Sequence, residues 1–213
     1  MEPFLSVSGP AAPLMLANVD TDVIIRVEPM TRHPRDALGP FAFEALRYRP
    51  DGSEDPEFIL NQPPFRGAPI LLAGANFGCG SSREPAVWAL MGLGIRCVIA
   101  ASFGDIFFGN CFQNGVLPIV LDEHTIEGLA TTARTGAAMI VDLAQRKLSI
   151  GDSAPLPFQV DDLRRESLLE GLDAIGLTLK DAPVITAWQD ADRTRRPWIW
   201  SYPDSEVRAA AGG

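Results

Sequence analysis

The run Asn76–Pro85 (NFGCGSSREP) brings small, hydroxyl-bearing and cationic side chains together in one short stretch. Gly78 and Gly80 would let the backbone turn sharply and approach a ligand closely. Free backbone N–H groups at the start of a following helix, together with Arg83, would bind a carboxylate or a phosphate. The pattern therefore predicts an anion-binding loop. A tight turn with a surface arginine is the alternative that the local chemistry leaves open.

Two familiar glycine motifs do not fit this run. The dinucleotide-binding pattern GxGxxG and the nucleophile elbow GxSxG would both require glycine where Arg83 stands. The two histidines, His33 and His124, lie in no segment typical of a catalytic triad. The sequence therefore argues against a dinucleotide site and against a serine hydrolase.

The segments around the loop form a recognisable unit. We expect a strand at Ala68–Ala73, a loop at Gly74–Arg83, a helix at Glu84–Leu93 closed by Gly94, and a second strand at Ile95–Ala100. This order is typical of a right-handed parallel βαβ unit. Ligands of such sheets bind outside the carboxyl ends of the strands, where this loop would lie.

The start of the expected helix has residues suited to its position. Ser81 or Ser82 could cap it with a side-chain oxygen. Pro85 suits the first turn because its missing N–H is not needed there.

The N-terminal third is harder to assign. Met1–Pro13 is rich in Pro, Ser and Gly and predicts an arm or a short edge strand. Asn18–Ile25 (NVDTDVII) predicts an Asx-rich turn that leads into a β-branched strand. Repeated prolines interrupt residues 28–66, where Gly39–Tyr48 alone has helical character. A loop of this length is usually functional or mobile.

The C-terminal half continues with alternating elements. We expect helices at Ser102–Asn110, His124–Arg134 and Asp161–Gly171, a strand at Val116–Leu121, and a hairpin of Met139–Leu143 with Lys147–Ile150. The stretch Arg193–Tyr202 combines three arginines with Trp198, Trp200 and Tyr202. This tail could bind a partner, fold back on its own domain or fray.

Composition narrows the class of protein. The 213 residues are 46% hydrophobic, which is enough for a continuous core in one large or two small domains. A net charge of −9 argues against general nucleic-acid binding. We find no apolar run long enough to span a membrane and no basic residue before Arg26 to begin a secretory signal. We therefore expect a soluble, cytoplasmic protein.

The three cysteines are Cys79, Cys97 and Cys111, with no CxxC pair. This spacing argues against a disulfide framework and a zinc ribbon. Since iron–sulfur clusters usually take about four thiolates, it also argues against a cluster held by this chain alone. Cys97 lies in an apolar run and is best explained as a core residue.

The run Asn76–Glu84 resembles the glycine–serine–arginine signature of the aconitase superfamily, and the similarity is greatest to the small subunits of 3-isopropylmalate dehydratase. Four further segments agree in order: Asn18–Ile25, Ser102–Asn110 (SFGDIFFGN), Gln113–Pro118 (QNGVLP) and Gly171–Leu179 (GLDAIGLTL). Together the five motifs cover most of residues 15–180.

This resemblance implies an α/β fold: a single swivelling β/β/α domain over residues 1–213, with a mixed parallel and antiparallel sheet and flanking helices. It implies a mobile substrate loop at about 28–66 and a flexible tail at about 190–213. It also implies a separate large subunit that carries a [4Fe–4S] cluster, with no metal bound by this chain. The substrate would be a small dicarboxylic acid of the malate type that loses and regains water between C2 and C3.

Carried over residue by residue, the resemblance makes Ser81 the catalytic base and Arg83 the clamp on a substrate carboxylate. The resemblance implies further substrate contacts from Gly80, Ser82, Arg32 and Arg35, and supporting roles for Thr21, Asp22, Asn76, Cys79 and Asn110. Structural interpretations stay open for several of these residues. Asp22 could be a turn or capping residue, Asn110 a helix-ending residue, and the two arginines exposed side chains of a mobile loop.

Two departures from the family pattern affect the substrate. Pro85 stands where the family commonly has histidine, and Arg26–Pro40 differs from the usual substrate loop. Another alkyl malate, such as a methyl- or dimethylmalate, or homoaconitate is therefore the alternative to 3-isopropylmalate. A carboxylate-binding domain without catalysis is the alternative to an enzyme.

Overall fold

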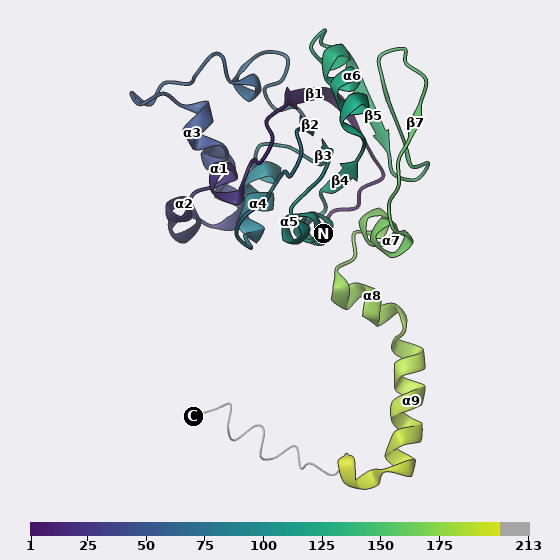
Figure 1. Ribbon diagram of the computed structural model, residues 1–213. Coiled ribbons are helices and arrows are strands. Elements are labelled where there is room, and N and C mark those ends of the chain that lie inside the picture. The colour runs from purple at the N-terminus through teal and green to yellow at the C-terminus, as the bar shows by residue number, and fades with distance from the viewer. Residues whose placement is uncertain (201–213) are drawn as a thin grey trace. The chain divides into compact units, whose positions relative to one another are not determined.

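The computed structural model describes residues 1–200 (Figure 1). Its contacts divide the chain into two compact units, Met1–Asp173 and Ala174–Gly213. The first unit contains the sheet and the candidate site. The expectation of a single swivelling domain over the whole chain stays a prediction.

A seven-stranded mixed sheet forms the centre of the first unit, with the order β4-β3-β2-β1-β5-β6-β7. The strands are β1 (Ser6–Leu14), β2 (Ile70–Ala73), β3 (Cys97–Ala100), β4 (Leu117–Val120), β5 (Ala138–Asp142), β6 (Lys147–Ile150) and β7 (Leu156–Pro157). Strands β1 to β4 pair in parallel, whereas β1 with β5, β5 with β6, and β6 with β7 pair antiparallel. The mixed α/β architecture predicted from the sequence is confirmed.

The N-terminal segment occupies the middle of this sheet, so the prediction of an arm or edge strand was wrong. Residues Ser6–Pro10 of β1 pair with β5, and residues Ala11–Leu14 pair with β2. Each half of the strand therefore pairs on one side. This arrangement tolerates Pro10 and Pro13, because a missing N–H costs nothing on an unpaired side.

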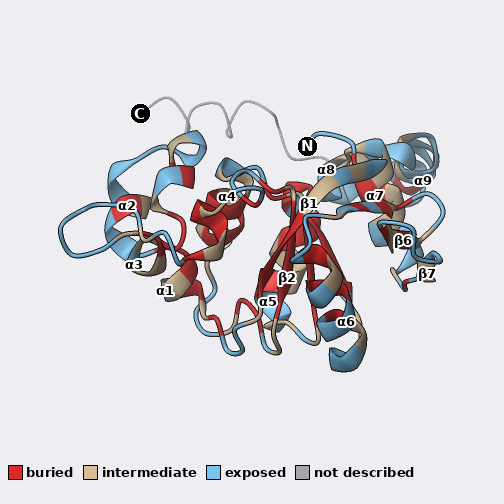
Figure 2. Cartoon of the chain, turned by 90° about the horizontal axis from the view of Figure 1, so that it is seen from above, coloured by how far each residue is buried: buried red, intermediate tan, exposed pale blue. Residues whose placement is uncertain are grey.

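Helices cover both faces of the sheet (Figure 2). In the first unit they are α1 (Thr21–Ile24), α2 (Val27–Arg32), α3 (Glu44–Arg47), α4 (Glu84–Gly92), α5 (Asp105–Asn114), α6 (Glu123–Ala133) and α7 (Asp162–Glu170). Alternate residues of each parallel strand enter different cores. Leu71 and Val98 pack with α4 and the 28–66 segment, while Ile70 and Ile99 pack with α6. This period of two explains why the parallel strands are apolar throughout.

Most predicted elements around the sheet are confirmed within a few residues. Segment Asn18–Ile25 is different, because it forms the short helix α1 instead of a strand. The carboxylate of Asp20 accepts a hydrogen bond from the backbone N–H of Val23 at 2.8 Å, which caps the helix. This cap outweighs the strand propensity of the β-branched residues that follow.

The 28–66 segment contains more helix than the sequence predicted. Beside α2 and α3 it has three short 3₁₀ helices: η1 (Arg35–Ala37), η2 (Gly39–Phe41) and η3 (Ile59–Asn61). Leu38 and Phe43 anchor the segment in the core that also contains α4. The buried side chain of Arg47 donates to Asn61 and to backbone carbonyls of the same segment. The expected mobility of the 28–66 segment stays a prediction.

A close contact between η2 and α4 holds this segment beside the sheet. A Cβ atom added at Gly39 would lie 2.3 Å from the carbonyl oxygen of Gly92. We expect Gly39→Ala to lower the free energy of unfolding by about 1–3 kcal/mol, because the backbones would have to separate. Urea denaturation of the chain measures this.

Gly128→Ala is the matched control for that substitution. Gly128 lies within α6, and an added Cβ would meet no atom within 4 Å. This variant should gain about 0.5–1 kcal/mol, because alanine favours the helix. Equal stability of the two variants would contradict the close packing of η2 on α4.

The second unit is helical where it is described, with α8 (Ala174–Lys180), α9 (Ala182–Arg195) and η4 (Pro197–Ile199). Asp192 is almost completely buried and accepts hydrogen bonds from Arg196 and Trp200. The bond from Arg196 is the main cause that lowers the pKa of Asp192. The rest of the expected flexible tail, from Ser201 onward and including Tyr202, lies outside the described residues. Within residues 1–200, no helix combines the length and apolar character needed to cross a bilayer.

Candidate active site

The serine loop, residues 76–83, lies at the carboxyl end of β2, where the predicted βαβ unit would put it. On one side it is hydrogen-bonded to the segment that follows β1. Gly78 N donates to the carbonyl of Val19 at 2.7 Å, and Thr21 N donates to the carbonyl of Cys79 at 3.0 Å. The side chain of Asn76 also donates to that of Asn18 at 2.8 Å.

On the other side, the segment between β3 and α5 holds the same loop. The hydroxyl of Ser102 accepts from Asn76 N at 2.8 Å, and the carbonyl of Ser102 accepts from Phe77 N at 3.0 Å. Gly104 N donates to the carbonyl of Phe77 at 2.9 Å. The buried ring of Phe77 packs edge-on against Phe107, with 5.5 Å between the ring centroids. Hydrogen bonds from both neighbouring segments therefore fix the loop.

The two glycines of the loop are required by its geometry. Gly78 and Gly80 have φ angles of +71° and +89°, in the region that favours glycine. A Cβ atom at Gly78 would also lie 2.2 Å from the ring of Phe107. The sharp turn predicted from the sequence is present.

Ser81 and Ser82 are exposed, so the predicted helix cap was wrong. Arg83 occupies the N-cap position of α4, and no side chain caps that end. Pro85 lies in the first turn, as predicted. The hydroxyl of Thr21 donates to the carbonyl of Ser81 at 3.1 Å, which fixes the backbone and leaves the Ser81 hydroxyl open to solvent.

Arg83 is held beside these serines by an ion pair. Its guanidinium donates to the carboxylate of Asp22, which lies in α1. The Arg83 side chain is 18% exposed and that of Asp22 is 54% exposed. Among the described residues, the Arg83 side chain makes no hydrogen bond besides the one to Asp22, so other N–H groups of its guanidinium are available to an anion.

The other predicted site residues lie in different elements of the fold. Arg32 is exposed at the end of α2, and Cys79 is half-buried within the serine loop. Asn110 is part of α5, and its carbonyl accepts a hydrogen bond from the side chain of Asn114. Within the described residues, no side-chain bond joins Asn110 to the serine loop.

Arg35 and Asn114 form a contact that the sequence did not predict. Arg35 Nη2 donates to Asn114 Oδ1 at 2.7 Å, and its guanidinium lies over the ring of Trp88, 4.9 Å from the centroid. Asn114 ends α5 just before Gly115, whose φ is +83°. Its chain neighbours, Gln113 and Gly115, gave no pattern in the sequence that would mark position 114 as buried.

The other two cysteines are core residues. Cys97 and Cys111 are fully buried, and burial raises the pKa of both thiols. Among residues 1–200, no group of three or more His, Cys, Asp and Glu side chains is arranged to hold a metal ion.

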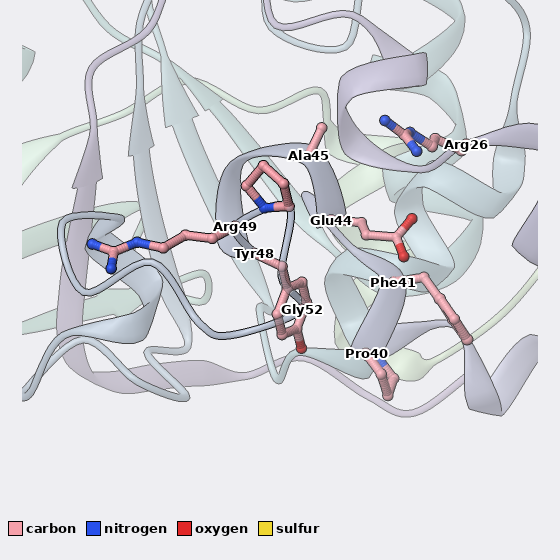
Figure 3. A pocket seen from close by; sticks show the side chains of 9 residues that line it. Arg26, Pro40, Phe41, Glu44, Ala45, Tyr48, Arg49 and Gly52 are labelled. Atoms are coloured by element: carbon pink, nitrogen blue, oxygen red, sulfur yellow. The ribbon is translucent and has the colours of Figure 1, made fainter.

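Residues of the 28–66 segment line two open cavities. One, of about 630 Å³, is lined by Arg26, Glu44, Tyr48 and Arg49, among others (Figure 3). The second, of about 600 Å³, is lined by Pro34, Arg35, Asp36, Trp88, Met91 and Gly92. The lining of neither cavity includes Ser81 or Arg83.

Comparison with known proteins agrees with this architecture. A family model described as the aconitase C-terminal domain matches residues 1–124. The fold and the serine loop, with this match, define a domain of the aconitase type. Relatives from Cereibacter sphaeroides and Rhodospirillum centenum, both named 3-isopropylmalate dehydratase small subunit, are 51% and 50% identical. Each alignment covers 93% of this chain, and 100% and 98% of the relatives. The chain therefore belongs to the family of 3-isopropylmalate dehydratase small subunits, and it is one subunit of a heteromeric hydro-lyase.

A solved structure agrees with the fold. The crystal structure of 3-isopropylmalate dehydratase from Methanocaldococcus jannaschii superposes with a TM-score of 0.64 and is 27% identical in sequence. The superposition covers 87% of this chain and 99% of that one.

Proposed function

We propose that this chain supplies the base and the carboxylate clamp of a two-subunit dehydratase that interconverts 2-isopropylmalate and 3-isopropylmalate through 2-isopropylmaleate, in leucine biosynthesis. Ser81 is the base and Arg83 is the clamp. The observation that carries the proposal is an exposed serine, Ser81, two residues before an arginine held by Asp22, in a loop fixed by hydrogen bonds from both sides. We expect the enzyme in the cytoplasm.

The reaction removes a proton from one carbon and a hydroxyl from its neighbour. In this assignment Ser81 takes the carbon-bound proton, and Arg83 holds a carboxylate so that this carbon faces the serine. Gly80 and Ser82 border the substrate, and Asn76 and Thr21 keep the loop in place.

A [4Fe–4S] cluster on the large subunit would supply the Lewis acid for the departing hydroxyl. Clusters of this type usually take about four thiolates. This chain has three cysteines, two of them fully buried in its cores. These residues do not fit a cluster site, so we assign the cluster to the partner.

The energetics of the base also favour a two-subunit enzyme. Ionising a serine hydroxyl near neutral pH costs about 12 kcal/mol. The N-terminus of α4 contributes at most ~2 kcal/mol of this. On the isolated chain, solvent reaches Ser81 and weakens the attraction of Arg83 for a developing negative charge. A second protein surface over the loop would exclude that solvent.

Reconstitution tests the proposal. We expect the purified chain alone to show no dehydratase activity with 3-isopropylmalate. Anaerobic mixing with a cluster-bearing large subunit should restore turnover. Full activity of the isolated chain would contradict the two-subunit mechanism. Turnover across a panel of alkyl malates and homoaconitate would then identify the substrate, since residues 26–40 differ from the usual substrate loop.

A further inference from the structure

One buried amide links the 28–66 segment to the helix that follows the serine loop. Asn114 is 3% exposed, and its side chain makes four hydrogen bonds. Its oxygen accepts from Arg35 Nη2 at 2.7 Å and from Trp88 Nε1 at 2.8 Å. Its nitrogen donates to Glu84 Oε1 at 2.8 Å and to the carbonyl of Asn110 at 2.9 Å.

This set of bonds uses the full capacity of an amide. A carboxamide oxygen has two lone pairs and its nitrogen has two N–H groups, and all four are satisfied here. Aspartate at position 114 could accept from Arg35 and Trp88, but it would face the carboxylate of Glu84. Leucine would leave buried polar groups without partners. The position therefore requires asparagine as long as Glu84 is present.

The partners of Asn114 belong to the 28–66 segment and to the start of α4. Glu84 is the first residue of α4 and directly follows Arg83. Arg35 comes from the 28–66 segment and is an exposed residue at the start of the short helix η1. Stacking on Trp88 and the bond to Asn114 restrict its guanidinium to one place. Among the described residues, Nη2 is the one nitrogen of Arg35 that makes a hydrogen bond, so its other edge can bind an anion.

We propose that Asn114 is a positioning residue: it holds Arg35 of the 28–66 segment in fixed register with α4, and hence with Arg83. Two cationic groups at a fixed separation match a dicarboxylic acid. The kinetic part of this inference rests on the proposed function, because it requires Arg35 to contact substrate. The structural part does not.

The structural part can be tested on the isolated chain by fluorescence. Replacing Trp188, Trp198 and Trp200 by phenylalanine leaves Trp88 as the single tryptophan. In that background we expect Asn114→Ala and Arg35→Ala each to raise acrylamide quenching of Trp88 about twofold, because each releases the guanidinium from the ring. The double variant should be no more quenched than the stronger single variant. Additive effects, or no change with Arg35→Ala, would overturn the proposal.

The kinetic part uses the reconstituted pair. We expect Asn114→Ala and Arg35→Ala each to raise KM about tenfold and to change kcat less than threefold, again without additivity. The matched control is Gln113→Ala, an exposed neighbour on α5, which should leave both constants unchanged. A loss confined to kcat would overturn the positioning role. If the wild-type pair is inactive, the proposed function fails, and the quenching result still decides the link to Arg35.

A second pair of variants, which exchanges the hydrogen-bond donor and acceptor between positions 114 and 84, tests the link if Asn114→Ala does not fold. Asn114→Asp should raise KM because it repels Glu84. Adding Glu84→Gln gives the new carboxylate an N–H donor, and the double variant should recover at least half of the lost affinity. Failure of Glu84→Gln to improve Asn114→Asp would contradict the proposed hydrogen-bond link.

Discussion

Ser81→Ala is expected to reduce kcat of the reconstituted enzyme by a factor of about 10³, with KM changed less than threefold. A positioned general base contributes typically 10²–10⁴ to the rate, and alanine removes the only atom that could take the proton. The Ser81 side chain makes no hydrogen bond within residues 1–200, and the bonds that hold the loop come from other groups, including the carbonyl of Ser81. The substitution should therefore leave the loop and the assembly of the two subunits intact.

The assay is initial-rate turnover of 3-isopropylmalate, with co-elution of the two subunits as the check on assembly. Ser8→Ala is the matched control, because Ser8 is also exposed but lies in β1, in the half that pairs with β5. It should be fully active. Activity of Ser81→Ala within tenfold of the wild type would exclude Ser81 as the base.

Arg83→Lys is expected to raise KM about 10- to 100-fold while kcat falls less. Hydrogen bonds to charged groups contribute roughly 1.5–3 kcal/mol, and lysine cannot reproduce the two parallel bonds that arginine offers a carboxylate. Lysine keeps the positive charge, so the ion pair with Asp22 and the attraction for an anion persist in part. Arg83→Lys therefore tests the two parallel hydrogen bonds of the guanidinium and not its positive charge.

Two companion variants sharpen that measurement. Arg134→Lys is the control, because Arg134 is an exposed arginine at the end of α6, and both constants should stay unchanged. Asp22→Asn should raise KM by a smaller factor than Arg83→Lys, since it frees the guanidinium without removing it. If Arg83→Lys leaves KM unchanged, Arg83 does not hold the substrate carboxylate.

The sequence predicted best those parts of the fold that depend on neighbouring residues. The unit β2–α4–β3 was recognisable because apolar runs, a proline in the first helical turn and Gly94 are all local signals. The position of β1 was not recognisable, because its partners β2 and β5 lie far along the chain. Its proline and glycine content suggested an edge, and the split pairing of the strand removes that penalty.

The candidate site shows the same division. Residues 78–83 were identified from the sequence, because glycines, serines and an arginine before a helix are typical of an anion-binding loop. The ion pair of Arg83 with Asp22 and the hydrogen bonds of Asn114 join segments that are distant in sequence. A single asparagine carries no pattern of its own. Contacts of this kind can be predicted only when the order of the strands in the sheet is known.

The split pairing of β1 also has a consequence during synthesis on the ribosome. Residues 11–14 can find their partner once residue 73 has been translated, whereas residues 6–10 wait for residue 142. At roughly 5–20 amino acids added per second, the interval between making the strand and making its second neighbour is roughly 6–25 seconds. During that interval residues 6–10 of β1 have no partner strand and can pair with a wrong one. A chaperone bound to them would prevent this.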